Sequence, residues 1–491
     1  MKFTPSSELV KRSLSGHGWI GLLVGGLLYL VCLTGTMAVF SDEFRRWEQP
    51  TVDENLSYSS SSVEKAITEF ILNDKLDSQY VTVAFPSPTL PRTTLYAGDE
   101  QGLALDNHAW LVETDGSVGT QVNDEWSTMF LTLHYYLHFP DTFGEVVVSV
   151  IGTLLIALIV SGFFSHPLIF RDAFRLRLTG FRRLEQADIH NRLSVWGAPF
   201  HLMIAVTGAF FGFAFVILPI EADALHDGDS TAVEESVYGS APQLQNQTGP
   251  LAVAVALDSM KTIAPDATLM RIEVNGVGGQ GQYLSISAKR SQRLVYEENY
   301  LFDSSGTYLY SHQNSDGAIG KQVVISAYRL HFGYFGGFAT KIIWGIAGFA
   351  LTVVSVTGVN VWLARRKTRD YLNCIWSGVV WGAPAALALT AIAQVIFGIP
   401  SKGIFWGVLI TAISLCVWLG NHRKGEQFLQ GVCALALVTL FAAHLLIFGT
   451  DALSSAAGGI NMAIVSAGAV MGMLAAKNSL GFFGEKIATQ P

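Results

Sequence analysis

Histidine is the residue in this sequence whose placement most suggests chemistry. Seven of the twelve histidines lie in or beside the first four strongly apolar stretches: His17, His134, His138, His166, His190, His201 and His331. Ionisable side chains are costly in lipid and usually face a bundle interior, where a partner offsets their desolvation. The position of these imidazoles therefore predicts that they bind something.

The histidines fall into two layers. His134, His138 and His331 stand where apolar stretches follow long polar segments, and the other four lie toward the opposite ends. His190 and His201 are eleven residues apart, so at about 100° per residue both point to one side of a helix. Two facing imidazoles can supply both axial ligands of a haem. The pattern therefore predicts two haem sites, one near each membrane face.

Other interpretations of single histidines remain open. His134 and His138, at i and i+4, could chelate zinc or iron on one helix face. A lone histidine at a membrane end could simply bond a headgroup or a carbonyl. His166, beside Pro167, and His444, in a region without partners, are the weakest candidates.

The elements that must position these residues are membrane helices. Of 491 residues, 50% are hydrophobic and 14% charged, a low charge for a soluble protein. Windows of about 20 apolar residues, enough to cross a bilayer, predict eight spans: 19–40, 143–165, 194–219, 338–363, 376–398, 404–420, 429–449 and 457–476.

Basic residues predict the orientation. They flank the same ends of the first four spans: Lys2, Lys11, Arg12, Arg171, Arg175, Arg177, Arg182, Arg183, Arg192, Arg365, Arg366, Lys367 and Arg369. By the positive-inside rule both termini are cytoplasmic in a multi-pass protein of the bacterial inner membrane. The first apolar core is too long for a signal peptide and lacks a small-residue cleavage site, so we interpret it as a retained helix. The four cysteines lie in or beside spans, which predicts no disulfide.

Two long polar segments lie on the opposite, periplasmic side. Residues 41–142 hold 17 Asp and Glu against 5 Lys and Arg, and residues 220–335 hold 13 against 7. This acidic face favours cations, although solubility explains it equally well. Each segment has a helical period followed by alternating strand patterns, as in a small α+β domain. The predicted organisation is 1–40 (first span), 41–142, 143–219 (two spans with a basic loop), 220–335, 336–368 (fourth span) and 369–491 (about four further helices).

The first part of the chain is duplicated. His17 precedes Thr34-Gly35 and His190 precedes Thr207-Gly208, each histidine 18 residues before the glycine. LHFPDTFG (137–144) likewise resembles LHFGYFGG (330–337), and the spans that follow carry Ser161-Gly162 and Thr357-Gly358. The repeated unit is a span, an outer domain and a second span.

These motifs, with SHPLIFRDAFRLR (165–177) and DIHNRLSVWGAPFHLMIAVTG (188–208), resemble the PepSY-associated transmembrane family over residues 10–368. The resemblance implies an iron-regulated inner-membrane protein with PepSY-like periplasmic modules and two b-type haems, similar to ferric-siderophore reductases. It implies that His134 or His138 with His331 holds an outer haem. It also implies an inner haem on His17, His190 and His201, with His166 as a further candidate.

The expected function is electron transfer across the membrane that reduces a ferric siderophore or another ferric chelate. The longest inner connection, 166–193, is too short for a flavin or nicotinamide domain, so the electrons come from quinol or a donor protein. A substrate platform is predicted at Tyr135, Tyr136, Tyr328 and Tyr334, which an interfacial aromatic belt explains equally well. We expect no nucleic-acid partner.

Two functions of other classes compete with this expectation. One is a haem-free PepSY scaffold or sensor that binds peptide or inhibits a protease. The other is a transporter that uses the extra helices, although the intramembrane acids common in proton-coupled carriers are nearly missing. The glycine motif GVGGQG (276–281) is not a dinucleotide site, because a strand pattern follows it where a helix is required.

Overall fold

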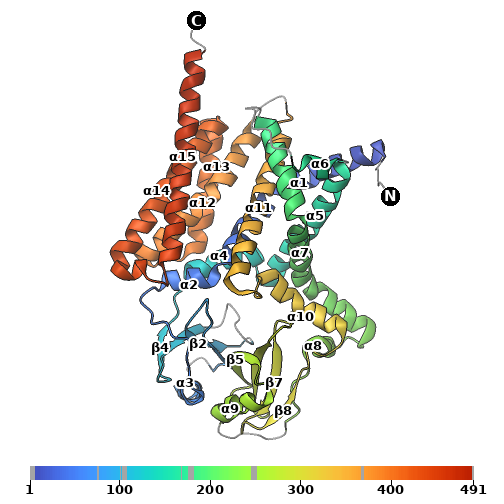
Figure 1. Cartoon of the computed structure of the whole chain (residues 1–491), viewed down its shortest axis with the longest axis vertical. Helices are drawn as coiled ribbons and strands as arrows, with labels where there is room; N and C mark the ends of the chain where they lie inside the picture. Colours follow the sequence, from blue (N-terminus) through green and yellow to red (C-terminus); the bar gives the residue numbers. More distant parts are fainter. Residues whose placement is uncertain are drawn as a thin grey trace. The chain divides into compact units, whose positions relative to one another are not determined.

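The computed structural model describes residues 6–73, 77–99, 101, 108–166, 168–174, 182–244, 251–366 and 370–488. Pro167 and five of the basic residues used to predict the orientation lie outside these ranges: Lys2, Arg175, Arg177, Lys367 and Arg369. The described chain forms two compact units (Figure 1). The membrane unit comprises residues 1–51, 124–215 and 336–491, and the sheet unit comprises residues 52–123 and 216–335.

Eight helices in the described ranges are long and apolar enough to cross a membrane, as the sequence predicts. They are α1 (Ser7–Ala38), α5 (Asp141–Ser165), α7 (Arg182–Leu225), α11 (Gly337–Leu363), α12 (Tyr371–Phe397), α13 (Ser401–Leu419), α14 (His422–Phe448) and α15 (Gly458–Ala488). The class of polytopic α-helical membrane protein with an α+β part is confirmed. Helix α7 begins in the membrane unit and ends in the sheet unit.

Short helices complete the membrane unit: α2 (Ser41–Glu48), α4 (Glu125–Tyr136), α6 (Ile169–Asp172) and the 3-10 turn η1 (Gly449–Leu453). Both α2 and α4 come from the segment predicted as an outer domain. Helix α2 is fastened by the ammonium of Lys341, which is buried and lies 2.8 Å from the Glu43 carboxylate. Helix α4 packs on α1 and α5 through an apolar face that contains the fully buried Phe130. These helices therefore belong to the membrane core.

Of the C-terminal helices, α12 packs on α1 and α4, α13 packs on α4, and α15 packs on α2. Helices α14 and α15, drawn orange-red and red, lie side by side (Figure 1). Hydrogen bonds fasten the region to the rest of the unit: the Tyr29 hydroxyl donates to the Val380 carbonyl (2.7 Å), and the Trp126 indole donates to the Leu387 carbonyl (3.2 Å). The region is therefore an integral part of the membrane unit.

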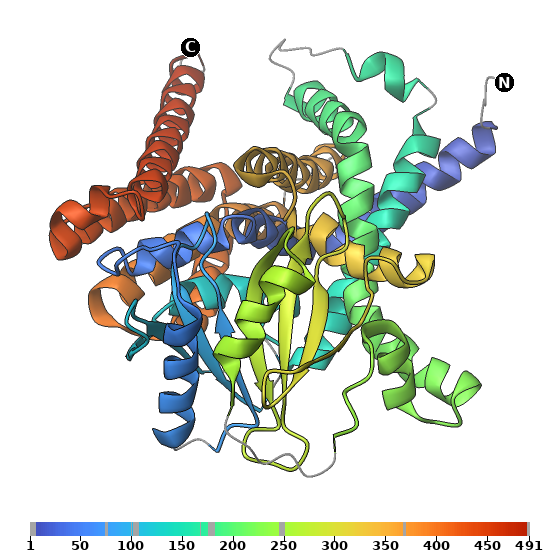
Figure 2. The same ribbon diagram turned by 60° about the horizontal axis from the view of Figure 1, so that its bottom comes forward.

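The sheet unit contains one antiparallel sheet of eight strands in the order β4-β3-β2-β1-β5-β6-β7-β8. The strands are β1 (Tyr80–Ala84), β2 (Thr93–Gly98), β3 (His108–Val112), β4 (Val118–Gln121), β5 (Ala267–Asn275), β6 (Tyr283–Arg290), β7 (Glu298–Asp303) and β8 (Tyr308–Ser311). Helices α3 (Ser60–Asn73) and α9 (Val253–Ile263) lie together on one face of the sheet (Figure 2). Helices α8 (Ser230–Tyr238) and α10 (Ile319–Phe332) complete the unit.

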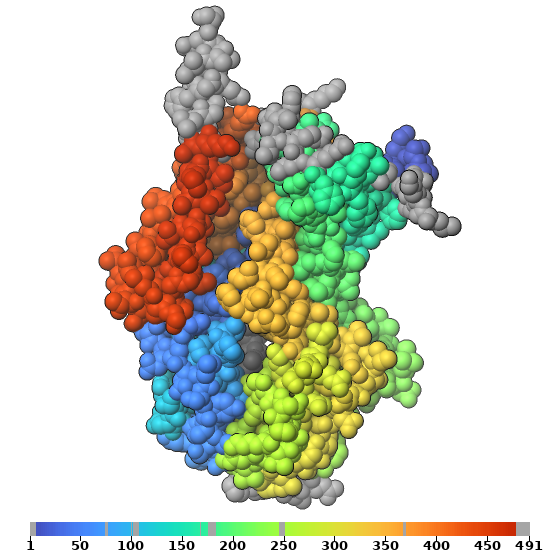
Figure 3. Space-filling view, viewed as in Figure 1, coloured from blue at the N-terminus to red at the C-terminus, as the bar shows by residue number. Residues whose placement is uncertain are grey.

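The two predicted outer domains share this sheet. Strands β1 and β5 pair antiparallel, with Val81 opposite Val274 and Val83 opposite Ile272, and all four side chains are fully buried. The two halves, blue and yellow-green, form one continuous surface (Figure 3). In each half one helix, α3 or α9, is followed by four strands. The GVGGQG segment is a turn between β5 and β6 with positive φ at Gly276 and Gly278, which confirms that it is not a dinucleotide loop.

Candidate functional site

His17 on α1 and His190 on α7 form the most regular arrangement of ionisable groups in the membrane unit. The Nδ1 atom of His17 lies 3.0 Å from the Leu158 carbonyl of α5. The Nδ1 atom of His190 lies 3.1 Å from the Val354 carbonyl of α11. A carbonyl can only accept, so each Nδ1 carries the proton and each Nε2 keeps its lone pair. This is the tautomer and orientation of a metal-binding histidine.

The two rings are also separated as a metal between them would require. Their centroids are 6.1 Å apart and their planes are inclined by 80°. Imidazole nitrogens bind metals at about 2 Å and lie about 1 Å from their ring centroid, so two axial imidazoles on one iron have centroids about 6 Å apart. The separation of His17 and His190 therefore fits two imidazoles that would bind one iron.

His134, in the last turn of α4, is held in the same way. Its Nδ1 atom lies 2.9 Å from the Val31 carbonyl of α1. Burial lowers the pKa of His134 to about 4, so the ring is neutral at physiological pH. The ring covers Gly35, where an added Cβ would lie 2.6 Å from the imidazole carbon Cε1. His134 is thus a third neutral imidazole whose Nδ1 is fixed by a main-chain carbonyl.

The carbonyls that accept hydrogen bonds from His17, His134 and His190 all belong to copies of one local sequence motif. The accepting carbonyl is followed three residues later by Ser or Thr and four residues later by Gly, which places all three groups on one helix face. The motifs begin at Val31, Leu158 and Val354, and the hydroxyls of Ser161 and Thr357 lie 3.2 and 3.3 Å from Nδ1 of their histidines. A fourth copy starts at Ile204, with Thr207 and Gly208. The sequence shows these pairs as repeats, but their contact with histidines appears only in the structure.

His138 has a different environment from His134. It follows the helix end, where Leu137 and His138 both take positive φ values of 53° and 60°. Its Nδ1 atom accepts the Trp406 indole N–H (2.9 Å), and its Nε2 atom donates to the Met129 carbonyl (2.9 Å). Both ring nitrogens are therefore occupied, and the structure favours His134 over His138 as a ligand. The same bonds leave His138 unable to chelate a metal jointly with His134.

His201 and His166 are separated from the His17–His190 pair. His201 is 1% exposed and hydrogen-bonds to the main chain at Ala347, seven residues from Val354 on α11 or about 10 Å along its axis. Its Nε2 atom has no hydrogen-bond partner among the described residues, which a ligand would supply. His166 ends α5, with Nε2 3.6 Å from the Asp172 carboxylate. The four histidines predicted for the inner haem are thus one close pair, His17 and His190, and two histidines that lie apart from it, His201 and His166.

His331 lies in the sheet unit, in the last turn of α10, as His134 does in α4. The shared LHF motif aligns His331 with His138, which follows the end of α4. Helix α10 ends in a left-handed residue, Gly333, with φ of 71°, as α4 ends in Leu137. His331 precedes its left-handed residue by two positions and His134 precedes its own by three, so both histidines lie in the last turn of a helix without occupying the same position.

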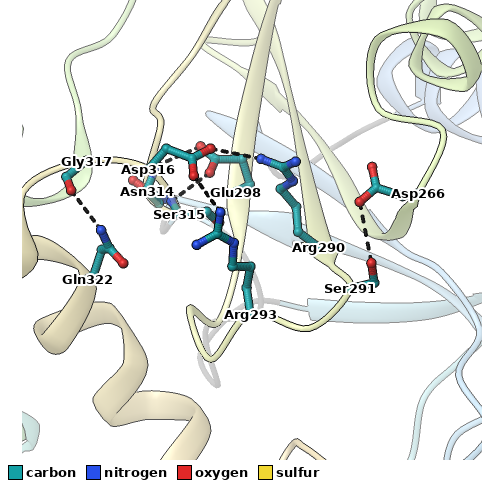
Figure 4. Close-up of polar contacts among 10 residues, drawn as sticks. All are labelled: Asp266, Arg290, Ser291, Arg293, Glu298, Asn314, Ser315, Asp316, Gly317 and Gln322. Carbon is teal, nitrogen blue, oxygen red and sulfur yellow. Dashed lines mark hydrogen bonds and ion pairs between the residues drawn. The ribbon is translucent and has the colours of Figure 1, made fainter.

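Two carboxylates fix the loop that leads into α10 (Figure 4). The buried Glu298 accepts the main-chain N–H groups of Asn314 (2.8 Å) and Ser315 (2.9 Å). Asp316 binds two arginines at 3.0 and 2.8 Å, Arg290 and Arg293. This network orients the start of the helix that carries His331.

A carboxylate also holds the start of α4. Glu48 accepts the main-chain N–H groups of Trp126 (2.9 Å) and Ser127 (2.8 Å) and the Ser127 hydroxyl. It therefore satisfies free N–H groups at the helix N-terminus, as a capping side chain does. Burial raises the pKa of Glu48 to about 8, against the effect of these hydrogen bonds. The sequence analysis does not identify this residue.

His444 is a structural histidine. Its ring stacks on Trp47 at 4.6 Å with planes inclined by 10°, and its Nε2 atom donates to the Trp47 carbonyl (2.9 Å). The Asn461 amide donates to Nδ1 of His444 (3.1 Å) and accepts the Trp47 indole N–H (2.9 Å). Both nitrogens of the fully buried ring are satisfied, so His444 fastens α14 to α2.

The predicted tyrosine platform divides between the two units. Tyr135 and Tyr136 belong to α4, with Tyr135 next to His134 at 5.7 Å between ring centroids. Tyr328 and Tyr334 belong to the sheet unit, where both rings lie against Tyr296 at 6.3 and 6.1 Å. Tyr135 and Tyr136 therefore belong to the helix of His134, and Tyr328 and Tyr334 belong to the unit that contains His331.

The sheet unit also has an open pocket of about 700 Å³ between α3 and α9. It is lined by Ser59, Ser60 and Ser61 on one side and by Asp258 and Lys261 on the other. The Ser60 hydroxyl donates to the Asp258 carboxylate (2.8 Å), and Lys261 pairs with the same carboxylate (2.8 Å). Its charged groups neutralise one another.

Replacing Gly35 by alanine should displace His134. The new methyl would lie 2.6 Å from the imidazole, so the ring must leave the Val31 carbonyl. Gly26 is the matched control on the same helix, because an added Cβ there has no described atom within 4 Å. In protein purified with its haem, we expect Gly35→Ala to lower the haem content or shift its absorption and Gly26→Ala to change neither. Equal spectra for the two variants would contradict this assignment of His134.

Comparison with known proteins identifies the family to which this chain belongs. The family model described as "PepSY-associated TM region" matches residues 14–365, which is more than half of the chain. The chain therefore belongs to this family of membrane proteins. It is also similar to a protein of Pseudomonas aeruginosa named Uncharacterized protein PA4219, with 24% identity over 347 residues that cover 65% of this chain and 86% of the relative. Helices α12 to α15 lie beyond the family match.

Proposed function

We propose that this protein carries electrons across a membrane on two b-type haems and reduces a ferric chelate, such as a ferric siderophore, on the outer side. The observation that carries the proposal is the His17–His190 pair. Its two rings are 6.1 Å apart, and each Nδ1 is bound to a carbonyl of a third or fourth helix. Hydrogen bonding from Nδ1 makes Nε2 a better donor to iron.

His17 and His190 would hold one haem, and His134 would be a ligand of the other. A haem with two imidazole ligands would supply a one-electron carrier whose potential the surroundings tune. His17, His134 and His190 would bind iron through Nε2, while the carbonyls of α5, α1 and α11 would fix the orientation of their rings. His17 and Val31 are fourteen residues apart on α1, so the two sites are separated by about 21 Å along that helix. That spacing suits one site near each membrane face.

The direction of transfer follows from the predicted topology. We place the basic ends of the spans and both termini in the cytoplasm of a bacterium, with the sheet unit in the periplasm. The electrons would enter near His17 and His190 from quinol or a protein donor. The ferric chelate would meet the sheet unit on the periplasmic side. Hard oxygen chelators hold Fe²⁺ less tightly than Fe³⁺, so reduction would release the metal.

Absorption spectroscopy of the purified full-length protein tests the proposal. We expect a Soret band, sharp reduced α and β bands, and two haems per chain. Anaerobically reduced protein mixed with a ferric chelate should return to the oxidised spectrum as Fe²⁺ forms. A colourless protein from haem-replete cells would overturn the proposal and favour a PepSY scaffold that binds peptide. A haem protein that stays reduced in the presence of ferric chelates would contradict the reductase activity alone.

A further inference from the structure

Lys289 on β6 and Arg329 on α10 form a cationic pair that has no carboxylate partner among the described residues. Four of the seven Lys and Arg residues in 220–335 have carboxylate partners: Lys261, Arg271, Arg290 and Arg293. Lys289 and Arg329 take part in no ion pair with the described residues. Instead, the Lys289 ammonium (3.5 Å) and the Arg329 Nε (2.9 Å) both donate to one neutral acceptor, the Tyr334 carbonyl.

Arg329 is the more buried of the two. Its side chain is 5% exposed, and its other described contacts are to main-chain carbonyls, those of Val295 (3.1 Å) and Arg293. Burying a charge is costly unless it is paired, and carbonyls only partly offset that cost. A bound anion would neutralise this excess charge.

The side chain of Tyr334, which supplies this carbonyl, belongs to a cluster of aromatic rings. The Tyr334 ring stacks on Tyr296 at 6.1 Å and on Phe332 at 5.5 Å, and Tyr328 lies 6.3 Å from Tyr296. Tyr334 is 36% exposed and Lys289 is partly exposed, so a ligand can reach them from solvent. Flat apolar faces beside two cations suit a planar or multidentate anion better than a small inorganic ion.

We propose that Lys289 and Arg329, together with the faces of Tyr296 and Tyr334, bind a carboxylate group of an anionic ferric chelate. This inference rests on the proposed function, because that function identifies the metal in the chelate as ferric iron. Recognition of the anionic group does not depend on electron transfer. It also refines the expectation from composition. The acidic outer segments favour cations, whereas this local site selects a negatively charged substrate. Tyr328 and Tyr334 thereby belong to a binding site with charge as well as aromatic surface.

Binding of gallium citrate to the full-length protein tests the proposal without any redox step. Gallium(III) has the charge of ferric iron but does not accept an electron under these conditions, so a failure of electron transfer cannot hide binding. We expect saturable binding that weakens as ionic strength rises. Lys289→Gln should weaken it about tenfold, as for the loss of a hydrogen bond to a charged group. Lys289→Glu should weaken it further.

Lys261→Gln is the matched control, because Lys261 lies in the same unit but is exposed and pairs with Asp258. Its affinity for gallium citrate should equal that of the unaltered protein. Equal affinities for Lys289→Gln and the unaltered protein would overturn the proposal. So would loss of haem from Lys289→Gln, since the pair would then serve the cofactor's own carboxylates. Competition by phosphatidylglycerol vesicles but not by free citrate would assign the site to lipid and likewise overturn it.

Discussion

Replacing His190 by alanine will remove about half of the bound haem and leave the other half spectroscopically unchanged. In the proposed function His190 and His17 share one haem site, because their ring centroids are 6.1 Å apart, whereas His134 contacts α1 fourteen residues beyond His17. Loss of one axial imidazole removes one of the two bonds that hold the iron. Haem extracted from the purified protein and counted per chain gives the measurement. His17→Ala should have the same effect.

The control is His166→Ala, because His166 ends α5 and lies 3.6 Å from the Asp172 carboxylate. We expect it to keep both haems. The double variant His17→Ala, His190→Ala should lose no more haem than either single variant, because both residues serve one site. Additive losses in the double variant would show that His17 and His190 belong to different sites. Loss of haem from His166→Ala would show that the predicted inner set is larger than the close pair.

Replacing His444 by alanine will destabilise the membrane unit without changing the haem spectrum of the protein that folds. The ring is 0% exposed, so its removal leaves a cavity against Trp47. It also leaves the Trp47 carbonyl and an N–H of the Asn461 amide without the hydrogen bonds that His444 makes with them. A buried ring deletion with unsatisfied polar groups costs about 3–5 kcal/mol. Thermal unfolding in detergent, followed by light scattering and by the Soret band, measures the loss.

The variant His444→Gln separates the contribution of the hydrogen bonds of His444 from that of its stacking on Trp47. A glutamine amide can keep one of the hydrogen bonds but cannot stack on Trp47, so we expect an intermediate loss of stability. Haem content per folded chain should stay at the level of the unaltered protein in both variants. A variant of His444 that folds normally but loses haem would make this residue a ligand and contradict the structural role.

Much of this architecture can be predicted from the sequence because the sequence signals are local. Apolar windows of about 20 residues predict the eight spans, since the bilayer sets their length. The repeat of His17 and His190, each 18 residues before a hydroxyl-glycine pair, predicts that they occupy equivalent places. The turn at 276–281 is readable because a strand pattern follows the glycines, which excludes the strand-to-helix geometry of a dinucleotide site.

The positions of helix ends are harder to predict from the sequence. The LHF motif matches His138 with His331, yet α4 stops at Leu137 in a left-handed conformation that a non-glycine residue rarely adopts. His138 therefore leaves the helix and bonds to Trp406, on a helix that the sequence suggests is merely appended. No local pattern predicts that contact, because the two residues are 268 positions apart.

The sequence by itself determined that this protein has eight helices long and apolar enough to cross a membrane, that its first part is duplicated, and that histidines recur at both ends of the first four. The tertiary structure decided which histidines meet, which are occupied by other side chains, and that the two long polar segments share one sheet through β1 and β5. The physical reason is that helical period and hydropathy fix the face and depth of a residue within its own helix. The carbonyl that orients His17 lies 141 residues away, and only packing of whole helices brings it within hydrogen-bond distance.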